Sequence, residues 1–203
     1  LVMADSEGRL YDGDQLLYVI AADYLARGAL GGGVVGTLMS NLGFEQALGR
    51  AGITLERAPV GDRYVLERMN EKGWLLGGEN SGHLLCLDKH TTGDAIVAAL
   101  AVLRALNGRT TSLAAATAPV TLFPQRLINV KLPKGFDWKA SAEIRAAEAN
   151  ARAALGERGR ILLRPSGTEP VLRVMVEAAD RMTADGCAQR VADSIAATLA
   201  TVG

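Results

Sequence analysis

The chain has 203 residues, of which 49% are hydrophobic and 22% charged, a balance typical of a folded globular protein rather than a disordered one. Its 22 basic side chains equal its 22 acidic ones, so no overall field favours a nucleic acid or an anionic membrane as a partner. The longest apolar run, 95–103, is shorter than the roughly 20 residues of a membrane span. Cys86 and Cys187 lie far apart without metal-ligand spacing, which predicts reduced thiols in a cytoplasmic protein.

Strands and helices are predicted to alternate through the first half of the chain. The predicted strands are 1–4, 9–11, 34–38, 53–58, 74–76 and 84–87. The predicted helices are 13–27 with Asp12 as its cap, 44–50, a segment that starts at an Asp62 N-cap and stops at Gly73, and 94–106 before Asn107-Gly108. This order predicts an α/β domain with a mixed sheet over residues 1–115.

The pattern changes after a stretch rich in Thr and Ala. Pro119 and Pro124 lie in that stretch, and we predict a linker over 116–124. Beyond it, the predicted strands are 127–132, 160–163 and 171–178, and the predicted helices are 140–155 and 183–199. Residues 125–203 are therefore expected to form a smaller α+β domain, with an antiparallel-rich sheet and two helices.

One polar segment, Gly78-Glu79-Asn80-Ser81-Gly82-His83, lies between two predicted strands. Glu79 and Ser81 can accept sugar hydroxyls, and an imidazole such as that of His83 can carry a proton near neutral pH. The alternative is structural, because a lone histidine often only completes a hydrogen bond and Glu79 could cap a turn. We favour a functional site. Arg63, in the first turn of a helix, could face the same ligand or remain in solvent.

The second polar segment, Arg164-Pro165-Ser166-Gly167-Thr168-Glu169-Pro170, is followed by Arg173. Guanidinium groups, hydroxyls and a glycine amide in one turn are the groups that hold a phosphate. The candidate phosphate ligands are Arg164, Ser166, Gly167, Thr168 and Arg173. The alternative is that both arginines are ordinary solvated strand residues. Glu169 either repels the phosphate or pairs with an arginine.

Two further segments resemble ligand loops but favour a structural interpretation. Asp12-Gly13-Asp14 could hold a divalent cation, but its place before an amphipathic helix favours capping. Gly31-Gly32-Gly33 precedes a strand rather than a helix, so it is interpreted as a turn and not as a phosphate loop. No metal ligands are therefore assigned.

Five motifs together resemble the C-terminal half of the α-D-phosphohexomutase superfamily, and within it the phosphoglucosamine mutases. The motifs are Gly36-Thr37-Leu38-Met39-Ser40-Asn41, Val60-Gly61-Asp62-Arg63-Tyr64-Val65, the segments 78–83 and 164–170, and Thr91-Thr92-Gly93-Asp94. They occur in the family's order, and the likeness covers almost the whole chain. The resemblance implies that the chain corresponds to the third domain of the family, which recognises the sugar, and to the fourth, which binds the phosphate.

The resemblance also implies roles for single residues. Enzymes of this kind interconvert glucosamine 6-phosphate and glucosamine 1-phosphate through a 1,6-bisphosphate, with Mg²⁺. By resemblance, Glu79 and Ser81 contact sugar hydroxyls and His83 is a candidate proton carrier. Asn80 occupies the position that varies with the sugar, and asparagine fits the amino-sugar branch. The five candidate phosphate ligands would hold the phosphate that is not reacting.

Two family signatures are absent from the chain, the phosphorylated serine motif and the Asp-rich metal loop. The start, Leu1 to Asp5, is similar to the family segment directly downstream of that metal loop, so upstream domains are expected as partners, beside a phosphosugar substrate. The Mg²⁺ ligands would lie in those domains, and the chain alone is expected to be inactive. The alternatives are a fragment of a glucose or mannose phosphate mutase, and a free-standing phosphosugar-binding module.

Overall fold

A computed structural model describes residues 1–133, 135–167 and 169–200. The chain divides into two compact units, Leu1–Leu122 and Phe123–Gly203. The division falls inside the predicted linker 116–124, although a short helix, α5 (Leu113–Thr117), ends inside that segment. The assignment of residues 1–115 and 125–203 to separate functional domains remains a prediction.

The first unit contains a mixed four-stranded sheet and a separate two-stranded hairpin. Its strands are β1 (Met3–Ala4), β2 (Leu10–Tyr11), β3 (Val34–Thr37), β4 (Leu55–Ala58), β5 (Leu76–Gly78) and β6 (Leu84–Cys86). Its helices are α1 (Gly13–Ala26), α2 (Leu42–Arg50), α3 (Asp62–Lys72), α4 (Ala95–Arg109) and α5 (Leu113–Thr117). The sheet order is β4-β3-β5-β6, in which β3 is parallel to β4 and β5, and β6 is antiparallel to β5. The predicted mixed sheet is confirmed.

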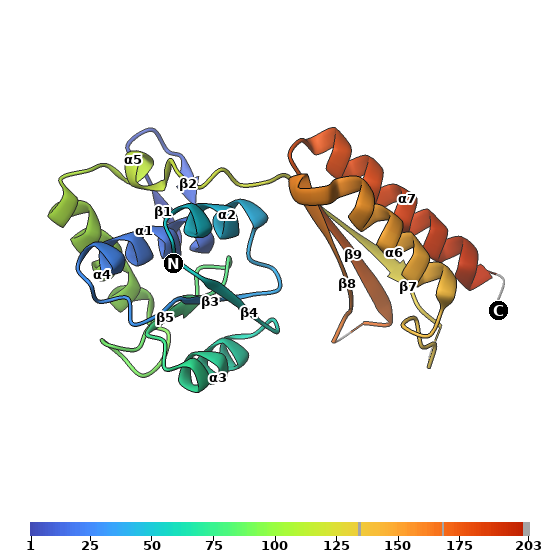
Figure 1. Ribbon diagram of the computed structural model, residues 1–203, viewed down its shortest axis with the longest axis horizontal. Coiled ribbons are helices and arrows are strands. Elements are labelled where there is room, and N and C mark those ends of the chain that lie inside the picture. Colours follow the sequence, from blue (N-terminus) through green and yellow to red (C-terminus); the bar gives the residue numbers. More distant parts are fainter. Residues whose placement is uncertain (134, 168, 201–203) are drawn as a thin grey trace. The chain divides into compact units, whose positions relative to one another are not determined.

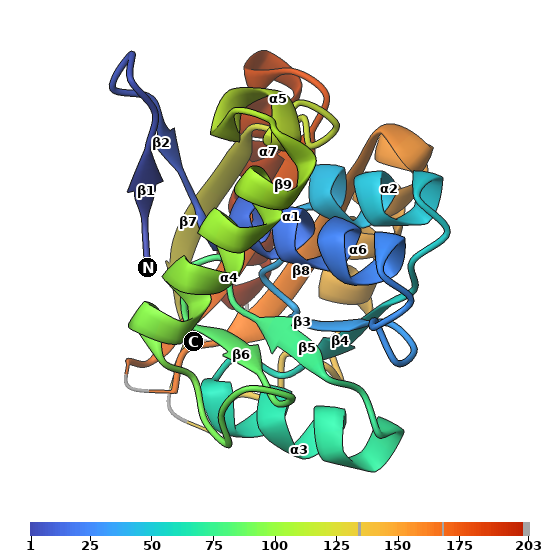
Figure 2. The ribbon, with the colours of Figure 1, turned by 90° about the vertical axis from the view of Figure 1, so that its left-hand side faces the viewer.

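Helices cover both faces of this sheet, as Figures 1 and 2 show, with α3 on one side and α1, α2 and α4 on the other. Alternate residues of a strand point to opposite faces, so both faces of a central strand must be apolar. Accordingly Val34 packs into the core beneath α1, while its neighbour Val35 packs with Val65 and Met69 of α3. The result is a three-layer α/β/α arrangement in which loops at the strand ends are free to carry polar groups.

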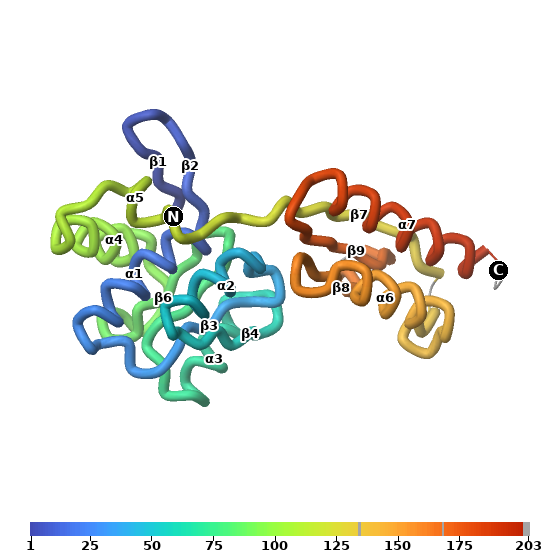
Figure 3. The backbone as a smooth tube through the Cα atoms, turned by 45° about the horizontal axis from the view of Figure 1, so that its top comes forward, coloured from blue at the N-terminus to red at the C-terminus, as the bar shows by residue number. Residues whose placement is uncertain are grey.

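The hairpin of β1 and β2 extends away from the helices of its unit (Figure 3). It is antiparallel, and it exposes apolar side chains, with Val2 57% and Leu10 73% exposed. The amino group of Leu1 donates to the carbonyl of Gly82 over 2.8 Å. The hairpin is thereby joined to the loop that follows β5.

Several helix ends agree with the predictions, among them the stop of α3 at Gly73, and others are corrected. Asp12 caps α1 through a capping box with Gln15, as predicted. Asp62 is not the N-cap of α3, because Gly61 occupies that position and Asp62 is the first helical residue. Helix α4 does not end before Asn107-Gly108 but continues to Arg109 and ends at Thr110, which adopts a left-handed conformation with φ of 48°.

The second unit is a three-stranded antiparallel sheet with two helices on one face, as Figure 1 shows. Its elements are β7 (Gln125–Lys131), α6 (Ala142–Leu155), a 3₁₀ turn (Gly156–Arg158), β8 (Gly159–Pro165), β9 (Val171–Ala178) and α7 (Arg181–Ala200). The order is β7-β9-β8, and the predicted α+β class is confirmed. Leu163, Leu172 and Val174 pack beneath the helices, so Arg164 and Arg173 belong to the opposite face.

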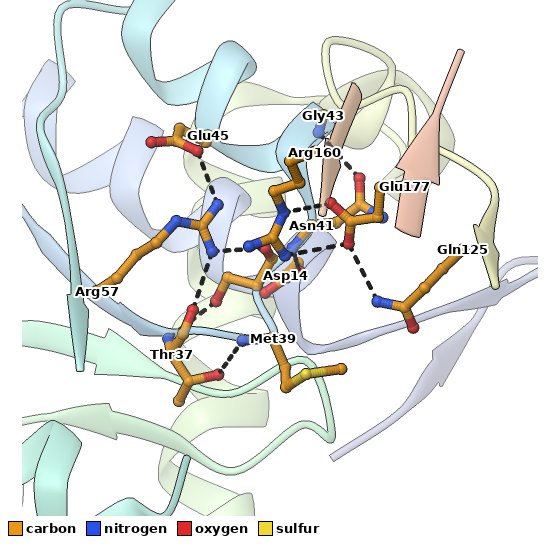
Figure 4. Close-up of polar contacts among 11 residues, drawn as sticks. Asp14, Thr37, Met39, Asn41, Gly43, Glu45, Arg57, Gln125, Arg160 and Glu177 are labelled. Carbon is orange, nitrogen blue, oxygen red and sulfur yellow. Dashed lines mark hydrogen bonds and ion pairs between the residues drawn. The ribbon is translucent and has the colours of Figure 1, made fainter. Parts of the chain in front are cut away.

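A buried ion pair lies on that opposite face at the other end of the strands (Figure 4). Arg160 donates through Nε to Glu177 Oε2 over 2.6 Å, and Gln125 donates to Glu177 Oε1 over 3.1 Å. Glu177 is fully buried, so these contacts replace the water that its carboxylate has lost. Among the described residues, no helix is both long and apolar enough to cross a membrane.

Candidate functional site

The first predicted site is the loop of residues 79–83, here called the sugar loop, which joins β5 to β6. It is closed by two backbone hydrogen bonds, from Glu79 N to His83 O (3.0 Å) and from Gly82 N to Glu79 O (2.9 Å). A third bond, from Gly13 N to Asn80 O (3.0 Å), joins it to α1. The contact is so close that a Cβ at Gly13 would lie 2.0 Å from Glu79 O. The main chain of the sugar loop is therefore fixed.

Two side chains of the sugar loop contact the N-terminus of α3. Glu79 Oε1 accepts from the amide of Gly61 over 3.1 Å, and His83 Nε2 lies 3.6 Å from Asp62 Oδ2. Gly93 lies against the imidazole, where a Cβ would approach Nε2 to 2.2 Å. These contacts orient the carboxylate and the imidazole, and they place Asp62 beside His83 instead of at the helix cap.

The remaining predicted sugar-binding side chains differ in their surroundings. Ser81 is exposed and Asn80 is half-buried, so both can meet a solute. Arg63 is 80% exposed and its Nε pairs with Glu67 over 2.8 Å, one helical turn away. Arg63 therefore has a carboxylate partner within α3, and its contact with a ligand remains a prediction.

The second predicted site is the phosphate loop, residues 166–170, which joins β8 to β9. Arg164 lies directly opposite Arg173 in the register of these strands, so the two guanidinium groups share one face. Like charges in directly opposed positions destabilise a sheet unless an anion lies between them. Within the described residues, Nε of each arginine is buried without a hydrogen-bond partner. Burial, and next the charge of Arg173, lower the pKa of Arg164.

Ser166 is held beside Arg173 by the fold of the turn. Its amide donates to the carbonyl of Val171 over 2.9 Å, and its hydroxyl accepts from Arg173 Nη2 (3.2 Å) and from the amide of Glu169 (3.3 Å). No atom lies within 4 Å of a Cβ built at Gly167, so its backbone faces open space. Thr168, the remaining candidate ligand, lies outside the described residues.

A carboxylate that sequence reasoning did not single out as a site lies inside the first unit. Asp14 is fully buried, and its Oδ2 accepts from the amide of Asn41 over 2.6 Å. Burial raises its pKa to about 7 despite that hydrogen bond. In the sequence this residue was noted only as part of the Asp12-Gly13-Asp14 segment, which was interpreted as a helix cap.

Arg57 also holds the turn between β3 and α2, to which Asn41 belongs (Figure 4). Its Nη1 donates to the carbonyls of Thr37 and Ser40, and its Nη2 donates to Glu45 Oε2 over 2.7 Å. The turn between β3 and α2 carries one of the five motifs. It is thus held by the buried carboxylate of Asp14 and by the guanidinium group of Arg57.

The acidic segment Asp12-Gly13-Asp14 does not fit a metal. Asp12 is used as a helix cap, and Asp14 faces the amide of Asn41. Across residues 1–133, 135–167 and 169–200, no group of three or more His, Cys, Asp or Glu side chains is placed to hold a metal ion. The expectation that Mg²⁺ ligands lie outside this chain therefore stays a prediction.

The fold and the two loops define a two-unit protein with a polar loop on an α/β sheet and an arginine-lined turn on an antiparallel sheet. The family profile "Phosphoglucomutase/phosphomannomutase, alpha/beta/alpha domain III" matches residues 12–122, and "Phosphoglucomutase/phosphomannomutase, C-terminal domain" matches 127–194. The chain belongs to the phosphoglucomutase/phosphomannomutase family, and the predicted resemblance is confirmed.

Curated relatives are similar over nearly the whole chain. A phosphoglucosamine mutase of an Azoarcus species is 58% identical over 195 residues, which are 96% of this chain and 43% of the relative. A phosphoglucosamine mutase of Thiobacillus denitrificans is 55% identical over 200 residues, which are 98% of this chain and 44% of that protein. The chain therefore spans less than half the length of these relatives.

Solved structures share the fold at low sequence identity. An N-acetylphosphoglucosamine mutase of Aspergillus fumigatus, in complex with GlcNAc-6P and magnesium, has a TM-score of 0.76 at 23% identity, covering 96% of this chain and 49% of that one. A putative phosphomannomutase from Thermus thermophilus has a TM-score of 0.62 at 19% identity, covering 93% of this chain and 41% of that one. These likenesses concern the fold alone.

Proposed function

We propose that this chain is the substrate-recognition half of a phosphoglucosamine mutase, which interconverts glucosamine 6-phosphate and glucosamine 1-phosphate through a 1,6-bisphosphate. The names of the relatives support this proposal, since identities of 55–58% extend over 96–98% of the chain. The catalytic half would be supplied by upstream domains, because the chain covers 43–44% of those proteins. A cytoplasmic location stays a prediction.

The observation that carries the phosphate-binding part is the pair of opposed arginines. Arg164 and Arg173 share one face, and Nε of each is buried without a partner among the described residues. A phosphate supplies the negative charge and the acceptor oxygens that these donors require. In this proposal Ser166, Gly167 and Thr168 complete the site with hydroxyl and amide donors.

The sugar-binding part is assigned to the sugar loop. Glu79 and Ser81 would contact ring hydroxyls, Asn80 the amino-bearing position, and His83 would carry a proton. One oxygen of Glu79 is already used by Gly61, so its other oxygen is the one available to the sugar. Arg63 would join the ligand only by leaving Glu67.

Such a division of labour suits a mutase, because either end of the sugar must reach the same phosphoryl donor. One site that binds the distant phosphate and a separate site that binds the sugar hydroxyls can hold the substrate in two opposite orientations. Binding energy from the part that does not react is then used to position the part that does. The chain's contribution to catalysis is orientation.

In this proposal the phosphoryl donor and the metal ligands belong to the upstream domains. The Aspergillus structure contains magnesium, whereas the described residues of this chain form no acidic cluster for a metal. Mg²⁺ would neutralise phosphate charge during transfer. We therefore expect the 203-residue chain to bind a phosphosugar without turning it over.

NMR titration of the chain with glucosamine 6-phosphate, glucose 6-phosphate and inorganic phosphate tests this proposal. Amide shifts at Gly167 and Arg173 are expected with all three ligands, and shifts at Asn80 and Ser81 with the amino sugar alone. Turnover by the pure chain would contradict the assignment of catalysis to upstream domains. In the complete protein, Asn80→Glu or Asn80→Met should move the preference away from the amino sugar, and an unchanged preference would show that Asn80 does not determine it. A complete protein that itself prefers glucose or mannose phosphate would favour that alternative.

A further inference from the structure

The phosphate loop already contains an anion of its own. Glu169 Oε2 lies 3.5 Å from Arg173 Nη2, and this is the one ion pair of Arg173 among the residues that the structure describes. Arg164 forms no ion pair within the same described set. Two positive side chains in one register therefore face a single negative one, which leaves the site with a formal charge of +1 before any ligand binds.

The carboxylate of Glu169 is placed so that it can move away from Arg173. Its side chain is 59% exposed, whereas that of Arg173 is 26% exposed. The backbone amide of Glu169 donates to Ser166 Oγ over 3.3 Å, so the main chain is attached to the turn by a contact that the side chain does not make. The carboxylate can thus rotate into water while the turn and its hydroxyl stay in place.

We propose that Glu169 is the resident counterion of the phosphate site: its carboxylate occupies Arg173 when no phosphate is bound and is displaced when the phosphate of a phosphosugar arrives. This inference rests on the proposed function. Binding is then an exchange of one anion for another on the same guanidinium. A carboxylate attached to the same turn competes at a high effective concentration, so it lowers the affinity for every anion that needs Arg173.

The exchange has a use in the proposed reaction. A bisphosphate that must be bound in two orientations has to release its anchored phosphate between the two chemical steps. An anchor with two uncompensated arginines would hold that phosphate tightly, whereas a carboxylate that returns to Arg173 compensates for its departure. Glu169 would therefore weaken binding modestly and make release easier.

The expected size of the effect follows from the exposure of the pair. Ion pairs between partly exposed side chains are weak, and breaking one changes a binding constant by roughly two- to fivefold. Glu169→Gln preserves the shape and the backbone contact but removes the charge. Glu148→Gln is the matched control, because it removes the same charge from an i,i+4 pair with Arg152 on α6 in the same unit.

The test is a calorimetric titration of the 203-residue chain and both variants with inorganic phosphate and with glucosamine 6-phosphate. Glu169→Gln is expected to bind both ligands about two- to fivefold more tightly, and Glu148→Gln to bind them as the unchanged chain does. In addition, the carboxyl ¹³C resonance of Glu169 should shift when phosphate is added to the unchanged chain. If Glu169→Gln binds equally or more weakly while the unchanged chain binds phosphate, the counterion role is wrong and the proposed function stands.

A different result separates the two proposals. If neither the unchanged chain nor Glu169→Gln shows heat or amide shifts with either ligand, the phosphate site itself fails and the counterion role fails with it. If only Glu169→Gln binds, the site exists and its own carboxylate blocks it, which supports both proposals.

Discussion

The sugar loop and the phosphate loop are held in different ways. The sugar loop is closed by backbone hydrogen bonds, and its Glu79 and His83 already face the N-terminus of α3. The phosphate loop leaves two buried arginine nitrogens without hydrogen-bond partners in the described structure, whereas the sugar loop leaves one buried nitrogen, His83 Nε2, in that state. The first loop is thus preorganised by backbone contacts within its own unit, whereas the second would, in the proposed function, be completed by an anion. Four measurements test this contrast.

The largest effect on the free energy of unfolding is expected from a change of pH. It concerns the turn between β3 and α2 in the first unit. The pKa of Asp14 is raised to about 7 by burial, so the folded chain keeps this proton to a higher pH than the unfolded chain does. The stabilisation is complete below about pH 4 and is lost as the pH rises through 7, by at most about 4 kcal/mol. Urea unfolding between about pH 4 and pH 8 should show this loss. Asp14→Asn should flatten it, and an unchanged slope would refute the assignment to Asp14.

The next largest effect concerns the closeness of α1 to the sugar loop. Gly13→Ala places a methyl group 2.0 Å from the backbone oxygen of Glu79. Because backbone cannot move aside as a side chain can, we expect a loss of about 3 kcal/mol in the free energy of unfolding. Gly49→Ala, on α2 with no atom within 4 Å, is the control and should gain roughly 0.5–1 kcal/mol. Equal unfolding midpoints for both variants would show that the loop is not fixed by this contact.

A substitution at the phosphate site should change the affinity for phosphate but should not lower the free energy of unfolding. Arg164→Ala removes a charged donor and is expected to weaken phosphate binding about 10- to 100-fold. Its unfolding free energy should stay the same or rise, because the opposed charge on Arg173 is no longer repelled. Arg152→Ala, on α6, serves as the control and should bind normally. A destabilised Arg164→Ala protein would mean that the arginine is structural.

The smallest effect is expected at the contact between the sugar loop and α3. Glu79→Ala removes the acceptor for the amide of Gly61 and should cost about 1 kcal/mol in the free energy of unfolding. Amide exchange at Gly61 should accelerate in parallel. Glu67→Ala, which removes an exposed acid from the same helix, should leave that exchange rate as it is.

Local signals in the sequence located the elements of the fold well. The Asp12 cap and the left-handed Gly73 depend on short-range chemistry that can be recognised from neighbouring residues. Asp62 was assigned to the wrong role because its partner, His83, is distant in the sequence and meets it only in the folded sheet. The end of α4 was missed because Asn107-Gly108 disfavours a helix without preventing one.

The same distinction applies to the two candidate sites. Polar residues grouped in single turns, such as those after β5 and after β8, could be found from the sequence alone. Three features could not, namely the burial of Asp14, the bond from Gly61 to Glu79 and the register that places Arg164 opposite Arg173. Each depends on which element packs beside another, and local patterns do not determine this.

In the proposed function, the opposed arginines also connect ligand recognition to folding. If β8 slipped by one residue against β9, Arg164 would turn toward the face where Leu163 packs beneath α6. A mispaired sheet would then lose its core and its phosphate site together. If phosphate binds the correctly paired sheet as proposed, and does not bind the slipped one, it would favour the native pairing by mass action.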